Sequence, residues 1–157
     1  VFKYVAPVNG VRQGTYEPVL LLITPKKQQL LSVGADYQIN KNNLLKTEFA
    51  LSNNDVNTFS KKDGGDDVGA AIRIMYSNLA MLNVTKGLLL TSAVDFEHVQ
   101  QKFKPLERIR NVEFTRDWGL PIVVEPATEN ILRLSTQLQN KNGSNTSYQF
   151  INYNRSS

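Results

Sequence analysis

The most constraining feature of the sequence is a pair of long alternating segments, residues 28–39 and 45–52, separated by an asparagine-rich cluster at 40–43. Successive side chains of a β-strand point to opposite faces, so each segment would present one apolar and one polar face. Clusters such as 40–43 favour tight turns. The pattern predicts a long β-hairpin, whose apolar face carries Leu31, Val33, Ala35, Tyr37 and Ile39 on one arm and Leu45, Thr47, Phe49 and Leu51 on the other.

The same alternation recurs along the rest of the chain, and no amphipathic helix separates one alternating segment from the next. Strands that follow strands in this way are typical of an antiparallel meander. We therefore expect an all-β fold of about seven strands. Beyond the first hairpin, the expected strands are 19–23, 68–77, 88–99, 131–139 and 147–154, and the segment 112–116 also alternates.

Strand and loop lengths raise two alternatives. The arms of the first hairpin exceed the roughly 5–6 residues usual in globular domains, and they match the roughly 9–11 residues that a strand needs to cross a bilayer. Tight turns at 40–43 and 140–146 alternate with long loops at 53–67 and 119–129, as in outer-membrane barrels. A soluble sheet with one wet face has the same periodicity. The fold is thus part of an outer-membrane β-barrel or, alternatively, a soluble β-sandwich or open sheet.

The length of 157 residues fits a single all-β unit over residues 1–157. A single-chain bacterial barrel usually has at least eight strands, in even number. Because the sequence predicts about seven strands, we expect the unit to be a fragment of a longer chain. The first residues lack the pattern of a signal peptide and do not begin with Met, which fits the same expectation.

Composition excludes several classes of function. Eighteen Lys and Arg residues oppose fourteen Asp and Glu, and they are spread along the chain. A nucleic-acid-binding protein would more often cluster its basic residues on one face, so no nucleic-acid partner is expected. The chain has no cysteine, which excludes disulfides, thiolate metal sites and a cysteine nucleophile.

Catalytic motifs are sparse. The single histidine, His98, follows Asp95 and Glu97 at the end of a predicted strand. A catalytic triad needs a nucleophile, a base and an orienting carboxylate, and no Gly-x-Ser-x-Gly turn accompanies His98. There is also no phosphate-binding glycine loop and no His-Glu-x-x-His motif. We predict that the protein is not an enzyme, and a hydrolase built on these three residues is the weakest hypothesis.

The loop at 53–67 is the best candidate for a metal site. Calcium takes six to eight oxygen ligands from carboxylates and carbonyls, and this loop is rich in them. The spacing does not match an EF-hand, and the same residue types are common in any long turn. The candidate calcium ligands are Asp55, Asp63, Asp66 and Asp67, and no other cofactor is expected.

The segment 107–118 mixes alternating charges with aromatic residues. Arg and Trp often anchor protein interfaces, so Arg110, Arg116 and Trp118 are candidate partner-binding residues. The structural alternative is that the charges pair across neighbouring strands, while Trp118 anchors at a membrane interface or at the edge of a core.

Several stretches, spread over roughly two thirds of the chain, carry a resemblance to a known group of proteins: 14–18, 24–28, 50–55, 57–60 and 103–118. In these stretches the chain resembles large, poorly characterised β-rich outer-membrane and cell-envelope proteins of Bacteroidetes. The resemblance implies a piece of a longer exported protein in the bacterial outer membrane or at the cell surface. It also implies that its partners are the outer membrane or other envelope proteins.

Two functional hypotheses follow. The first is a non-enzymatic cell-envelope protein, a segment of an outer-membrane β-barrel with a structural, transport or assembly role in a larger complex. The alternative is a soluble surface β-sandwich that binds a glycan or a protein through the loops at 53–67 and 119–129. The sequence does not identify a ligand or cargo for either one.

Overall fold

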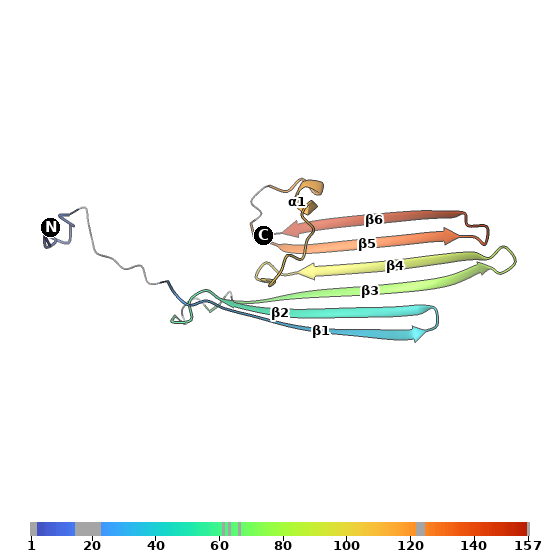
Figure 1. The fold of residues 1–157 in the computed structure, drawn as a ribbon, viewed down its shortest axis with the longest axis horizontal. Coiled ribbons are helices and arrows are strands. Elements are labelled where there is room, and N and C mark those ends of the chain that lie inside the picture. The colour runs from blue at the N-terminus through green and yellow to red at the C-terminus, as the bar shows by residue number, and fades with distance from the viewer. Residues whose placement is uncertain are drawn as a thin grey trace.

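The computed structural model describes residues 3–14, 23–60, 62, 64–65, 67–121 and 125–156. Six antiparallel strands form one sheet in chain order, and the sheet is not closed by pairing of its first and last strands (Figure 1). The predicted all-β antiparallel meander is therefore confirmed. The elements are β1 (Lys27–Asn40), β2 (Asn43–Asp55), β3 (Val68–Asn83), β4 (Leu88–Val99), the helical turn α1 (Phe114–Asp117), β5 (Thr128–Gln139) and β6 (Asn145–Ser156).

Three predicted segments differ from the structure or lie partly outside the described residues. Residues 19–22 of the predicted strand 19–23 lie outside the described residues. The strand suggested at 112–116 is wrong, because Phe114–Asp117 form a helical turn in which the Asp117 N–H donates to the Glu113 carbonyl. The strand predicted at 68–77 is longer in the structure, since β3 continues to Asn83 and pairs with the start of β4.

Asparagine side chains and the backbone conformation of glycine explain the tight turns. The Asn40 Oδ1 accepts hydrogen bonds from the Asn42 N–H at 2.9 Å and from Asn43 Nδ2 at 2.8 Å. Gly87 and Gly143 adopt positive φ angles of 57° and 83°, which glycine tolerates without a steric penalty. Short turns at 41–42, 84–87 and 140–144 lie at one end of the sheet, and the longer connections lie at the other (Figure 1). The predicted alternation of tight turns and long loops is confirmed.

The sheet has one apolar face and one charged face. Interstrand register places Val33, Phe49 and Ile72 side by side, and likewise Ile74 and Phe96. The apolar face is formed by Leu31, Val33, Ala35, Tyr37, Ile39, Leu45, Thr47, Phe49, Leu51, Ile72, Ile74, Tyr76, Leu90, Val94, Phe96, Leu132, Leu134, Leu138, Tyr148 and Phe150. The charged face carries Asp36, Lys46, Glu48, Arg73, Asp95, Glu97, Glu129 and Arg133.

The small core lies on the charged side of the sheet, at the long-loop end. The β4–β5 connection, residues 100–127, folds back over that face, and its Phe103 is 8% exposed. The apolar face is left open instead, with Tyr37 65% and Phe49 44% exposed. Among the described residues, the buried hydrophobic side chains are Val99, Phe103, Ala127 and Ile131.

No helix within the described ranges is both long and apolar enough to cross a membrane.

Candidate functional site

The central feature of the charged face is a chain of ion pairs that runs from β3 to β5. Arg73 donates from Nε and Nη2 to the two carboxylate oxygens of Asp95, at 3.0 and 2.8 Å. Arg133 Nη1 lies 3.2 Å from Asp95 Oδ2 and 3.5 Å from Glu97 Oε2. Arg133 therefore joins the two β4 carboxylates, and each of these acids is shared between guanidinium groups.

Arg110 extends this chain from the β4–β5 connection to β6. Its Nη2 donates to Glu129 Oε2 at 2.8 Å, and its Nη1 donates to Glu97 Oε1. The Tyr153 hydroxyl donates to the other oxygen of Glu129 at 2.9 Å. Burial alone would lower the pKa of the Arg110 guanidinium, but hydrogen bonds to Glu129 and Glu97 raise that pKa above its ordinary value. Arg110 thus stays charged between two acids.

Strand register explains why these charges meet. Asp95 lies directly opposite Arg133 on β5, and Glu97 lies opposite Arg73 on β3. Because every second residue of a strand shares a face, Asp95 and Glu97 both join the charged face. Opposite charges across an antiparallel pair are favourable. The alternating sequence therefore indicates a polar face, but the pairing itself depends on which residues lie opposite each other.

The start of the β4–β5 connection is fastened to β2 and β3. The buried Ser52 Oγ accepts a hydrogen bond from the Lys104 N–H at 2.9 Å. The Gln100 N–H donates to the Ala70 carbonyl at 3.0 Å. A Cβ atom added at Gly69 would lie 2.2 Å from the Phe103 nitrogen. Only glycine at this position lets the connection approach β3 so closely.

The far part of the connection packs on β6 through aromatic rings. The Phe114 and Tyr153 rings meet edge to face, with centroids 5.3 Å apart. Trp118 lies 5.2 Å from the Tyr153 ring and 6.2 Å from the Phe114 ring. The Arg110 guanidinium carbon lies 5.1 Å from the Phe114 centroid, within the range of a cation–π contact. α1 is therefore held against β6 by the Phe114 and Trp118 rings, and Arg110 packs on the Phe114 ring.

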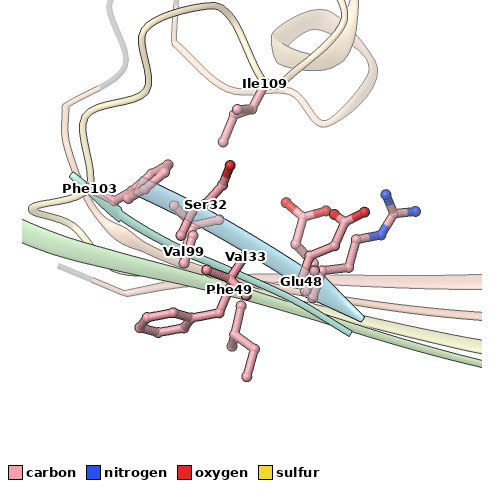
Figure 2. A pocket seen from close by; sticks show the side chains of 13 residues that line it. Ser32, Val33, Glu48, Phe49, Val99, Phe103 and Ile109 are labelled. Atoms are coloured by element: carbon pink, nitrogen blue, oxygen red, sulfur yellow. The ribbon is translucent and has the colours of Figure 1, made fainter. Parts of the chain in front are cut away.

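A cavity of about 500 Å³ remains between the charged face of β1–β3 and the β4–β5 connection. Figure 2 shows Ser32 and Glu48 on the side of the sheet that faces Ile109, whereas Phe49 projects from the opposite side. The residues on the cavity side are Ser32, Gly34, Glu48, Ala50, Ala71, Arg73, Glu97, Val99, Phe103 and Ile109.

The four acids of the candidate calcium loop are only partly described. The Asp55 Oδ1 accepts a hydrogen bond from the Asn57 N–H at 2.8 Å, and the Asp67 carbonyl accepts one from the Asn54 N–H at 2.8 Å. Asp63 and Asp66 lie outside the described residues. The described part of the chain contains no group of three or more His, Asp or Glu side chains that could hold a metal. The calcium hypothesis stays a prediction.

The three candidate partner-binding residues face different surroundings. Arg110 is turned inward, with its side chain 16% exposed between Glu97 and Glu129. Arg116 is 75% exposed and pairs only with its neighbour Asp117 among the described residues. Trp118 packs against the Phe114 and Tyr153 rings and is 36% exposed. Arg116 and Trp118 thus remain accessible to a partner, whereas Arg110 already holds two carboxylates.

His98 is separated from the acids that precede it. It lies on the apolar side of β4, where its Nδ1 is 2.7 Å from Asn130 Oδ1. Asp95 and Glu97 lie on the charged face, so the sheet separates them from the imidazole. These three residues therefore do not converge on one reacting atom.

Sequence reasoning recognised the polar face but missed the residues that meet it from elsewhere. Glu129 and Tyr153 complete the ion-pair chain, and Phe103 and Ile109 cover the cavity. The only sequence signal for Glu129 is its place two residues before Ile131, where the predicted strand begins, on the same face as Arg133.

Comparison with protein-family models, with curated proteins and with solved structures finds no match to this chain.

Proposed function

We propose that this chain is a segment of a β-barrel in a bacterial outer membrane, with its apolar face toward lipid and its charged face toward the interior. Its role is non-enzymatic: structural, transport or assembly work within a larger complex. The observation that carries the proposal is the uncovered apolar face, which extends over all six strands.

Burial supports this orientation. A soluble sheet places its apolar face on a core and its polar face in water. Here the only described segment that folds onto the sheet, the β4–β5 connection, covers the charged face. Large exposed apolar surfaces mark contact with a membrane or with another protein. Lipid on the apolar side and water on the charged side satisfy both faces.

The height of the apolar band fits a bilayer. On β2 the apolar side chains lie between Asn43 and Asn53, which are ten residues apart on the same face. At about 3.3 Å per residue this is about 33 Å along the strand. For strands tilted by about 40°, the band is about 25 Å tall, the height of the apolar belt in outer-membrane barrels.

The tilt can be inferred from the register. Leu45 on β2 and Leu134 on β5 lie in the same register row. Toward the tight turns, the apolar side chains of β2 end at Leu45, whereas those of β5 continue for four more residues, to Leu138. Toward the long loops, the apolar side chains of β5 end at Leu132, whereas those of β2 continue to Leu51, four residues beyond the register row of Leu132. A shift of about 13 Å over three strand spacings of about 4.8 Å corresponds to a tilt near 40°, within the range of barrels. The apolar side chains of β1, which run from Leu31 to Ile39, do not follow this shift between strands.

Two tyrosines lie near the tight-turn side of the band. Tyr37, Tyr76 and Phe150 lie in one register row across the sheet. In a sheet tilted by about 40° such a row crosses the band obliquely, so Tyr37 and Tyr76 lie near the tight-turn edge and Phe150 lies deeper. Outer-membrane barrels carry girdles of aromatic residues at the membrane interfaces, and the two tyrosines fit an orientation with the short turns just outside the bilayer.

The location follows from the resemblance to Bacteroidetes envelope proteins together with this two-faced sheet. The alternative of a soluble β-sandwich requires a second sheet packed on the apolar face. The described residues form a single sheet, and no contact among them favours the sandwich.

The test compares arginine at two adjacent positions on opposite faces. Ile74 points to the apolar face and Met75 to the charged face, opposite Asp95. We expect Ile74→Arg to lower the free energy of unfolding in lipid vesicles by about 2–4 kcal/mol, the cost of a charge on the lipid face. Met75→Arg should have little effect. Urea titration in vesicles measures both.

Vesicle flotation separates this proposal from a soluble fold. We expect the protein to float with vesicles and to leave native membranes only in detergent. A protein that stays soluble and monomeric without detergent, and does not float, would refute the proposal whatever the two arginine variants do. Equal destabilisation by Ile74→Arg and Met75→Arg would refute the assignment of the faces.

A further inference from the structure

The cavity over β1–β3 has a floor of small side chains. Ser32, Ala50 and Ala71 share one register row, and Gly34 lies in the next. Small residues at consecutive positions leave space between the sheet and the β4–β5 connection. The resulting volume of about 500 Å³ lies within the range of about 300–1,000 Å³ for small-molecule sites.

The two ends of the cavity differ in chemistry. Val99, Phe103 and Ile109 form an apolar end, and Ile109 lies above the sheet in Figure 2. Glu48 lies at the other end, beside Arg73 and Glu97. Small-molecule sites characteristically combine an apolar lining with a few polar groups that orient the ligand.

The charges at the polar end do not balance. The Arg73 guanidinium is bound by both oxygens of Asp95, and Glu97 is bound by Arg110 and Arg133. Glu48 lies opposite Arg73 in the register, but no ion pair to Glu48 is formed within the described residues.

The chain of ion pairs is itself balanced, because three carboxylates meet three guanidinium groups. Glu48 adds a further negative charge on the cavity wall, and its carboxylate is not taken up by any of these pairs. The paired carboxylates are Asp95, Glu97 and Glu129, and the guanidinium groups are those of Arg73, Arg110 and Arg133.

We propose that this cavity binds a small solute with one positively charged group and an apolar body. The cation contacts the Glu48 carboxylate, and the apolar body packs against Phe103 and Ile109. The inference rests on the proposed function, because the cavity opens on the face assigned to the barrel interior. It gives that interior a ligand class, namely organic monocations.

Three probes with the same indole body test the role of charge. They are tryptophanamide, which is a cation, N-acetyltryptophanamide, which is neutral, and N-acetyltryptophan, which is an anion. Binding is measured by titration calorimetry on the protein extracted from native membranes into detergent micelles. We expect the cation to bind about tenfold more tightly than the neutral probe, the effect of one charge-assisted hydrogen bond, and the anion to bind more weakly than either.

Variants then assign the effect to this site. Glu48→Gln should remove the preference for the cation and leave binding of the neutral probe unchanged. Asp36→Asn is the matched control, because Asp36 is an acid of the same face that pairs with Lys46 outside the cavity. Ala71→Met fills the floor and should weaken all three probes.

Each outcome decides the inference. Equal binding of the cation and the neutral probe, no binding of any probe, or an unchanged preference in Glu48→Gln would each overturn it. Loss of the preference in Asp36→Asn as well would overturn the assignment to Glu48. Vesicle flotation is measured on the same samples, so a protein that floats without binding the cation refutes this inference while leaving the barrel proposal standing.

Discussion

Replacing Arg110 by methionine should release the β4–β5 connection from the charged face. Arg110 joins this connection to β4 through Glu97 and to β5 through Glu129. Methionine retains an unbranched apolar stem, so it can still pack near Phe114, but it removes the guanidinium group. The change therefore tests the ion pairs more than the packing.

The magnitude follows from burial and from the partners that remain. The side chains of Arg110 and Glu97 are each 16% exposed, and that of Glu129 is 17% exposed. Breaking a fully buried pair costs about 3–5 kcal/mol, because the remaining charge is left unpaired. Here Glu97 keeps Arg133, and Glu129 keeps the Tyr153 hydroxyl. We therefore expect a smaller loss, about 2 kcal/mol.

Hydrogen exchange measures this loss locally. A change of about 2 kcal/mol corresponds to about a thirtyfold larger open population of the connection. Amides of residues 106–121 should exchange faster by that factor, while amides in the middle of β3 and β4 keep their rates. Arg116→Met is the matched control, because Arg116 is 75% exposed and pairs with its neighbour Asp117. Unchanged protection in Arg110→Met, or equal acceleration in Arg116→Met, would refute the reasoning.

Two further predictions concern the close approach at β3 and the orientation of the sheet. Gly69→Ala should lower the free energy of unfolding by about 1–3 kcal/mol in a urea titration, because its Cβ would lie 2.2 Å from the Phe103 nitrogen. Gly65→Ala, with no atom within 4 Å of its added Cβ, should leave stability unchanged, and equal losses would contradict this account. Lipids with brominated acyl chains should not quench the fluorescence of Trp118, which packs on the charged side. They should quench the fluorescence of the tryptophan introduced by Phe96→Trp in a Trp118→Phe background, because Phe96 lies on the apolar face. The reverse pattern would invert the faces.

The hairpins were predictable because their periodicity is local. Alternation over 28–39 and 45–52 and the asparagine cluster between them predicted β1, β2 and their turn, and the structure lengthens each arm by a few residues. A strand with two different environments must alternate along its length, so its faces can be read from the sequence without knowledge of its neighbours. The same reasoning predicted a polar face on each alternating segment, and in the structure that face includes Asp95 and Arg133.

The fold of the β4–β5 connection could not be predicted in this way. Its position depends on Gly69 and Ser52, which precede it by 34 and 52 residues in the contacts with Phe103 and Lys104. The alternation in 112–116 does not lead to strand pairing, because Phe114–Asp117 form α1 and the Phe114 ring packs on Trp118. The role of Arg110 likewise depends on Glu129, which only the fold brings close. Non-local contacts of this kind leave no periodic signal in the sequence.

Strand parity limits how the sheet can be completed in a membrane. β1 and β6 form its two edges in the described part of the chain, and unpaired backbone groups in lipid cost several kcal/mol each. The proposed function therefore requires both edges to pair with further strands. Since all neighbours are antiparallel, β1 and β6 run in opposite directions. Only an even number of added antiparallel strands can join them. A longer chain with an even total, or a second copy contributing six, satisfies this condition, whereas a single added strand does not.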